Sequence, residues 1–201
     1  MRSTIEWAMS ELIRNPDTLL RLQRELTDVV GLHRIVEDSD LDKLPFLGCV
    51  VKETFRMHPP IPMLLHEAAH DSVLGGYSVP RGSRMMINMW AINRCREAWK
   101  DGDIFRPSRF MAGEGEAAGR DLKGGSFEFL PFGSGRRSCP AQGLGLHAVK
   151  FAVAQLVHGF DWELPDGMKP ADLDMGDISS LTASRATRLY AVPTTRLTCP
   201  L

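Results

Sequence analysis

The sequence has no apolar run long enough to cross a bilayer, and residues 1–7 lack the apolar core of a signal peptide. It also lacks an excess of charge, because 24 lysines and arginines stand against 25 aspartates and glutamates, for a formal net charge of −1. This balance gives no reason to expect a nucleic acid or an anionic membrane as a partner. The 201 residues are enough for one domain of ordinary size.

Cysteine is scarce, and the four cysteines (Cys49, Cys95, Cys139 and Cys199) are far apart and irregularly spaced. That spacing excludes the paired motifs of zinc sites and the dense framework of small disulfide-bonded proteins, and it fits a reducing compartment. The sequence shows no internal repeat and no low-complexity tract. Its nearest approach to a linker is 112–125, which is rich in Gly, Ala and charge and predicts an exposed loop.

Helical periodicity dominates what is present. Asn15, Pro16 and Asp17 are typical of a helix start, and Gly31 is typical of a helix end. Short alternating segments follow Pro60. The sequence therefore predicts a mainly α protein with small β-sheets. The expected helices are 4–13, 16–29, 45–57, 88–93 and one that follows Cys139 and ends near 159; the expected strands are a hairpin over 73–79, a strand over 84–87 and a pair over 161–164 and 187–192; 38–43 is expected to be a turn and 196–201 a mobile tail.

The most informative stretch is 132–141, which reads Phe-Gly-Ser-Gly-Arg-Arg-Ser-Cys-Pro-Ala. Gly133 and Gly135 permit a tight loop. Apolar residues at helical spacing begin at Leu144, which puts Cys139 just before a helix N-terminus. Because free N–H groups and the helix dipole favour an anion there, we expect Cys139 to be a thiolate, acting either as a nucleophile or as a metal ligand.

The pattern of Phe132, Gly135, Arg137 and Cys139 is Phe-x-x-Gly-x-Arg-x-Cys. It resembles the haem-binding loop of cytochromes P450, in which the cysteine thiolate is the axial iron ligand. The resemblance implies haem b as the cofactor, with its iron bound by Cys139. Ala141 stands where the family usually has glycine, and its small side chain suits the same close packing. The alternative is a loop of glycines and arginines that cradles a phosphate beside an incidental cysteine.

The same resemblance implies roles for residues around the haem. Arg137 would pair with a propionate, and His66 is a second candidate for that role, with an ordinary histidine of a strand or loop as the alternative. Phe132 would pack near the thiolate and shield it, which differs little from the role of any core aromatic.

A second motif lies upstream, where Glu53 and Arg56 are three residues apart and share one helix face. Taken alone, they indicate a solvated surface ion pair. Followed by Met-His-Pro-Pro over 57–60, they resemble the E-x-x-R helix of cytochromes P450, and 105–110 resembles the family's P-x-R-F segment. The resemblance implies a buried triad of Glu53, Arg56 and Arg109 that supports the site without taking part in its chemistry.

Substrate contacts also follow from the resemblance alone. Ile61, Pro62, Met63 and Leu64 fall where the family's chain passes over the haem, and a late loop with Leu181 and Thr182 has the same role. These apolar and small polar side chains suit a small aromatic substrate. For each of them, a plain core or turn residue is the alternative.

The whole chain is similar to plant microsomal cytochromes P450, above all to the ferulate or coniferaldehyde 5-hydroxylases of lignin biosynthesis. The segments that carry this likeness are 59–67, 127–132, 162–170 and 197–201. It implies the hydroxylation of a phenylpropanoid or other phenolic with O2 and with electrons that NADPH–cytochrome P450 reductase supplies. It also implies an endoplasmic reticulum membrane location, on the cytosolic face, for a full-length parent.

By this likeness, 1–201 is a single partial domain, the C-terminal part of the cytochrome P450 fold. We expect the chain alone to lack the membrane anchor, to be cytosolic and to be inactive as a monooxygenase. Two other classes stay open. One is a non-catalytic truncated fragment or interaction protein, and the other is an enzyme that uses Cys139 as a nucleophile.

Overall fold

Four helices carry most of the regular structure in the computed structural model, which describes residues 1–122, 124–178 and 180–199. They are α1 (Arg2–Arg14), α2 (Pro16–Val30), α3 (Pro45–Met57) and α5 (Gln142–Gly159). Proline begins both α2 and α3, where its missing N–H is not needed and its fixed φ suits a helix. Gly31, with a φ of 77°, follows the end of α2 in a conformation that favours glycine.

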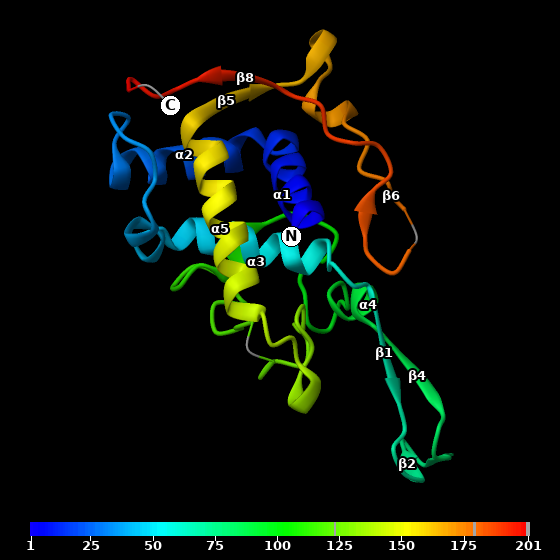
Figure 1. Cartoon of the computed structure of the whole chain (residues 1–201). Coiled ribbons are helices and arrows are strands. Elements are labelled where there is room, and N and C mark those ends of the chain that lie inside the picture. The colour runs from blue at the N-terminus through cyan, green and yellow to red at the C-terminus, as the bar shows by residue number, and fades with distance from the viewer. Residues whose placement is uncertain (123, 179, 200–201) are drawn as a thin grey trace.

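The apolar faces of these helices form the core. Leu12 of α1, Leu22 of α2, Val50 of α3 and Val153 of α5 are completely buried. Helix α5 crosses α3 in Figure 1 and packs against each of the other three helices. The long helices are thus held together by apolar burial, as their sequence periodicity predicts.

The strands form small two-stranded antiparallel sheets. β1 (Met63–Glu67) pairs with β4 (Arg84–Asn88), and β2 (Ser72–Leu74) pairs with β3 (Tyr77–Val79) across a turn at Gly75 and Gly76. β5 (Phe160–Glu163) pairs with β8 (Val192–Thr195), and β6 (Asp177–Ile178) pairs with β7 (Ser184–Arg185). In Figure 1 the β1–β4 ribbon extends away from the helices.

The remaining elements are short helices in the connections. They are η1 (Asp38–Lys43), α4 (Met89–Ile92), η2 (Pro107–Phe110), η3 (Gly135–Arg137), η4 (Pro165–Gly167) and η5 (Pro170–Asp172). Within the described residues, no helix has both the length and the apolar character needed to cross a membrane. The mainly helical architecture with small sheets confirms the predicted fold class.

The predicted strand over 187–192 is misplaced. Its partner strand is β5 as expected, but β8 spans Val192–Thr195. The Leu189 N–H instead donates to the Glu6 carboxylate of α1 at 3.0 Å. The segment before β8 is therefore tied to a helix, which no strand pattern could have indicated.

Asn15 stands at the N-cap of α2, as the sequence predicts, although its side-chain amide donates to the Glu11 carbonyl of α1 at 2.8 Å. A smaller prediction is wrong. The expected mobile tail is anchored, because the Thr198 N–H donates to the Leu32 carbonyl at 2.9 Å. Residues 200–201 of that expected tail lie outside the described residues.

Candidate functional site

The loop over 132–141 holds its cysteine in a closed turn. Gly133 and Gly135 have φ of 73° and 72°, in the left-handed region that glycine tolerates best. The Cys139 N–H donates to the Phe132 carbonyl at 2.9 Å, which closes the loop. Because α5 begins at Gln142, the cysteine lies just ahead of the helix N-terminus, as the sequence predicts.

Cys139 lines a cavity of about 870 Å³. The cavity wall comes from α1, from α3, from β1 and the residues before it, from the cysteine loop and from the first turns of α5. Phe132 lines it too, and its ring lies 5.0 Å from the ring of Phe55, which also lines the cavity. Segments that are far apart in the sequence therefore enclose one thiol-bearing space.

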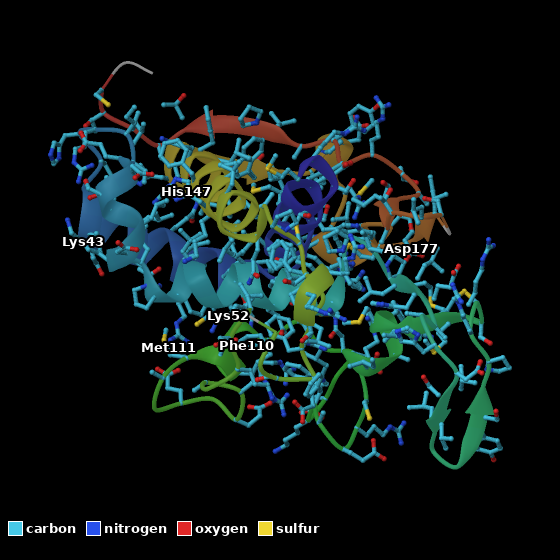
Figure 2. The ribbon with its side chains drawn as sticks, turned by 60° about the horizontal axis from the view of Figure 1, so that its bottom comes forward. Lys43, Lys52, Phe110, Met111, His147 and Asp177 are labelled. Carbon is cyan, nitrogen blue, oxygen red and sulfur yellow. The ribbon has the colours of Figure 1, made fainter. Side chains whose placement is uncertain are left out.

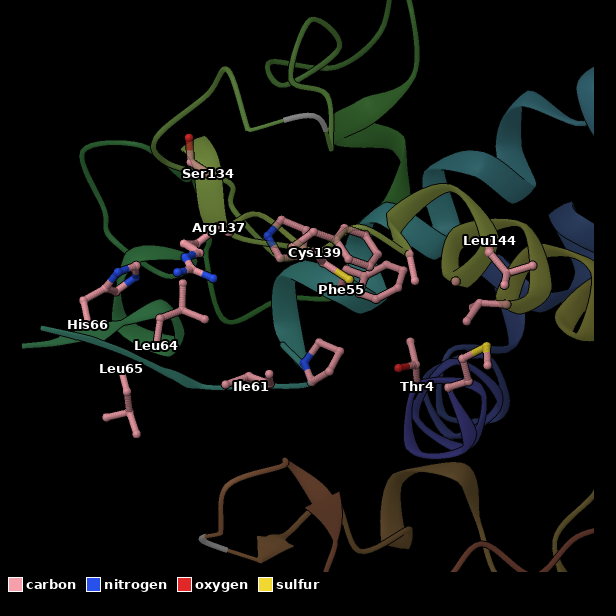
Figure 3. A pocket seen from close by; sticks show the side chains of 18 of the residues that line it. Thr4, Phe55, Ile61, Leu64, Leu65, His66, Ser134, Arg137, Cys139 and Leu144 are labelled. Carbon is pink, nitrogen blue, oxygen red and sulfur yellow. The ribbon is translucent and has the colours of Figure 1, made fainter.

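The basic side chains of the cavity wall lie on one side of Cys139, beside Leu64 and Leu65 (Figure 3). They are Arg137 and His66, whereas Leu144 lies on the other side with Thr4. Such a space can take a flat apolar group that carries anionic substituents, because a guanidinium and an imidazole are there to receive them.

The predicted substrate residues divide into two groups. Ile61 and Leu64 line the cavity, whereas Pro62, Met63, Leu181 and Thr182 are not part of its described wall. The Leu181 side chain is 69% exposed. Pro62 links its segment to the start of α4, because its carbonyl accepts the Met89 N–H at 2.9 Å.

Glu53, Arg56 and Arg109 meet in the protein interior. The Arg56 guanidinium donates from Nε and Nη2 to both Glu53 oxygens, at 2.7 and 2.9 Å, and Arg109 Nε donates to Glu53 Oε1 at 3.0 Å. All three side chains have 0% exposure. This is a fully buried cluster and not a solvated surface pair.

Backbone carbonyls satisfy most of the remaining guanidinium donors of this triad. Arg56 donates to the carbonyls of Asn93, Gly102 and Ile104. Arg109 donates to the carbonyls of Lys100, Asp101 and Ile104. The triad thereby fixes the irregular chain between α4 and η2. Helix α3 also contacts η2 through Lys52, which lies beside Phe110 in Figure 2, with 5.4 Å between Lys52 Nζ and the ring centre.

Glu116 adds a second carboxylate that sequence reasoning missed. Its Oε1 accepts from Arg109 at 2.6 Å and from Arg106 at 2.7 Å. Burial alone would raise the pKa of Glu116, but hydrogen bonds from its own backbone and from Arg106 lower it below the ordinary 4.5. The segment 112–125 is thus not simply an exposed loop; the alternation of glycines and glutamates gave no signal of the contact.

Trp99 connects the triad to the cysteine loop. The Arg56 guanidinium lies 5.2 Å from its ring centre, and its indole N–H donates to the Glu128 carbonyl at 3.3 Å. Phe129 packs edge-on against the same ring, with 5.8 Å between ring centres. Since 128–131 leads directly into 132–141, the buried cluster supports the base of the cysteine loop.

A sequence-family model described as Cytochrome P450 matches residues 1–189. This chain belongs to the cytochrome P450 family. Cytochrome P450 84A1 of Arabidopsis thaliana is 58% identical over 99% of this chain and 38% of that protein. Flavonoid 3'-monooxygenase of the same plant is 47% identical (97% and 38%), and geraniol 8-hydroxylase of Catharanthus roseus is 45% identical (96% and 38%). The chain spans 38% of the length of each of these relatives.

Solved structures give the same family at lower identity. Two zebrafish cytochrome P450 structures, with progesterone and with abiraterone, match at TM-scores of 0.80 and 0.83 and 30% identity. The match covers 96% of this chain and 42% and 44% of theirs. The chain therefore has part of the cytochrome P450 fold.

Cytochromes P450 are oxidoreductases that use haem bound through a cysteine thiolate. The donor set of this chain fits such a group. The cavity presents one thiol, an apolar wall that includes Phe55 and Leu144, and Arg137 with His66 as partners for carboxylates.

Proposed function

We propose that Cys139 binds the iron of haem b in the cavity, with Arg137 and His66 pairing with the propionates. The single observation that carries this proposal is that Cys139, Arg137 and His66 line one apolar cavity although His66 is more than 60 residues from the loop. Phe132, which lines the same cavity, would shield the thiolate once haem is bound, and Gly135 gives the loop its left-handed turn. Bound haem would supply oxygen activation, which a thiolate ligand favours.

The other residues of the chain hold this site in place. Hydrogen bonds of Glu53, Arg56 and Arg109 hold the chain that precedes the loop. Trp99 packs against Arg56 and donates to the Glu128 carbonyl, which links this cluster to 128–131. The closed turn at Cys139 then holds its sulfur at a set position on the cavity wall. Preorganised support of this kind keeps a ligand in place without rearrangement when the cofactor binds.

We further propose that the reaction is hydroxylation of a phenylpropanoid or other phenolic, with O2 and with electrons from NADPH–cytochrome P450 reductase. The 58% identity to Cytochrome P450 84A1 and the likeness of 59–67 and 162–170 to ferulate or coniferaldehyde 5-hydroxylases support this substrate class. Ile61 and Leu64 are the substrate contacts that the cavity favours.

The complete activity belongs to a protein of the relatives' length, in which 1–201 is part of a single domain placed at the endoplasmic reticulum membrane. Cavity-wall residues such as Leu144 are 69% exposed in this chain, which supports the proposal that the chain alone is inactive. Across the described residues, no histidine or carboxylate hydrogen-bonds to the Cys139 thiol, so a nucleophile enzyme has little support.

A haem titration of the purified chain tests the cofactor site. We expect one haem per chain, and we expect Arg137→Gln to weaken binding about tenfold because a charge-assisted hydrogen bond is lost. Arg136→Gln is the matched control, since Arg136 is adjacent and does not line the cavity. No haem uptake, or equal losses in the two variants, would contradict the proposal.

A further inference from the structure

Trp7 of α1 lies at the junction of three segments. Its side chain is 1% exposed, and its indole N–H donates to the Ala183 carbonyl at 3.0 Å. The His58 ring stacks on one side of the indole, with 3.8 Å between ring centres and 7° between planes. The Arg185 guanidinium lies 5.1 Å from the same indole ring. The indole is thus held in one orientation, and its single donor is committed to one carbonyl.

Ala183, which directly precedes β7, links Trp7 to the cavity wall. The Ala183 N–H donates to the Pro60 carbonyl at 3.1 Å, and Pro60 and Ile61 both line the cavity. A second tie joins α1 to the first residue of β7, because Ser3 Oγ and Ser184 Oγ lie 3.1 Å apart. The Ala183 carbonyl therefore accepts from Trp7 of α1, and the Ala183 N–H donates to Pro60 of the cavity wall.

Helix α1 itself also reaches the cavity. Thr4 is one turn before Trp7 and lines the cavity from the side that Figure 3 shows near Leu144. The α1 face that carries Thr4, Trp7 and Glu11 continues to His58, whose Nε2 lies 2.7 Å from Glu11 Oε1. Helix α1 therefore contacts His58 at the end of α3 and Ala183 before β7, and through Ala183 it is linked to Pro60.

We infer that Trp7 is a positioning residue that fixes the Pro60–Ile61 part of the cavity wall through the Ala183 peptide, and so sets the space available to a bulky ligand. This inference rests on the proposed function for the identity of the ligand space. It assigns a role to Trp7 that depends on its N–H donor, not on its bulk alone. Trp7→Phe keeps an aromatic ring beside His58 and Arg185 and removes the donor and part of the ring.

Hydrogen exchange of the purified chain tests the tie directly and needs no haem. In Trp7→Phe we expect amides over 180–185 to exchange about fivefold faster than in the parent chain, because one buried hydrogen bond is lost. Amides of the exposed β2–β3 hairpin exchange by local opening that does not involve Trp7 and should be unchanged. Trp162→Phe is the matched control, since its indole also donates to a carbonyl, that of Leu156 at 2.9 Å, away from 180–185.

Unchanged exchange over 180–185 in Trp7→Phe, or an equal acceleration in Trp162→Phe, would overturn the inference. Should Trp7→Phe fail to fold, Ser3→Ala removes the second tie and should accelerate exchange around Ser184 by a smaller factor. No acceleration there would count against the inference as well.

Ligand binding to the haem-loaded chain tests the consequence for the cavity. Trp7→Phe should leave the affinity for imidazole unchanged and change that for 4-phenylimidazole about fivefold, because only the larger ligand reaches the displaced wall. Equal effects on the two ligands would contradict the role of Trp7 in shaping the cavity. If the parent chain binds no haem, the proposed function fails, and hydrogen exchange still decides the role of Trp7.

Discussion

At the scale of single residues, Glu53 is a fully buried carboxylate that is paired with two arginines. Its carboxylate accepts from Arg56, from Arg109 and from the Arg106 backbone N–H at 2.8 Å, all without solvent. Burying these charges is tolerable only because each donor and acceptor has a partner. A cluster of this kind contributes little when exchanged whole for apolar residues, but loss of one member leaves a bare buried charge.

Glu53→Gln should therefore destabilise the chain strongly. It leaves the buried Arg56 guanidinium without a carboxylate and Arg109 with only the partly exposed Glu116, and we expect the free energy of unfolding to fall by about 3–5 kcal/mol. Denaturant unfolding followed by circular dichroism measures this. Glu114→Gln is the control, because Glu114 pairs with Arg21 at the surface and exposed pairs are worth about 1 kcal/mol or less. Equal losses in the two variants would refute the account of the triad.

At the scale of elements, the sequence predicts what depends on local signals. Proline at the first position predicts the starts of the helices over Pro16–Val30 and Pro45–Met57, and Gly75 and Gly76 predict the turn of the β2–β3 hairpin. Elements that depend on distant partners are not predictable in this way. The chain near Leu189 is set by Glu6 of α1, and the tail by Leu32.

The candidate site divides along the same line. The loop over 132–141 and the Glu53–Arg56 pair have fixed local spacing, so motif reasoning finds them. Phe55 and Leu144 enter the cavity only through the crossing of α3 and α5, and Glu116 reaches Arg109 only through the folding of an irregular loop. No local periodicity encodes those contacts, which is why they appear only in the folded chain.

The loop that carries Glu116 offers an element-scale test. A Cβ at Gly115 would collide with the backbone of Arg109 and Ser108, whereas one at Gly119 would meet nothing within 4 Å. Gly115→Ala should therefore displace the loop and lower the free energy of unfolding by about 1–3 kcal/mol. Gly119→Ala in the same loop should be nearly neutral. Thermal unfolding of both variants checks this, and a neutral Gly115→Ala would show that the loop does not pack on η2.

At the scale of the whole molecule, His58 and Glu11 join α3 to α1 across the core. The two side chains lie 2.7 Å apart and are 12% and 6% exposed. Burial lowers the pKa of His58 below the ordinary 6.5, and the hydrogen bond to Glu11 offsets only part of that effect. Burial also lowers the pKa of His158, in the same direction.

These histidines make stability depend on pH. Because their pKa values are lower in the folded state, the unfolded chain takes up more protons as pH falls through 6.5, and the folded state loses stability there. We expect the free energy of unfolding to rise from about pH 5 to pH 7. His58→Gln should flatten this slope, whereas His70→Gln, at an exposed position, should not. A slope unaffected by His58→Gln would contradict this explanation.

The central claim is that this chain forms the thiolate side of a haem site through Cys139. The carbon monoxide spectrum of the reduced, haem-loaded chain tests it most directly. We predict a red-shifted Soret band of the kind that thiolate ligation produces, lost in Cys139→Ala and kept in Cys95→Ala, whose cysteine lies outside the cavity. A Soret band without the red shift in the parent chain, or a red shift that survives Cys139→Ala, would contradict the claim.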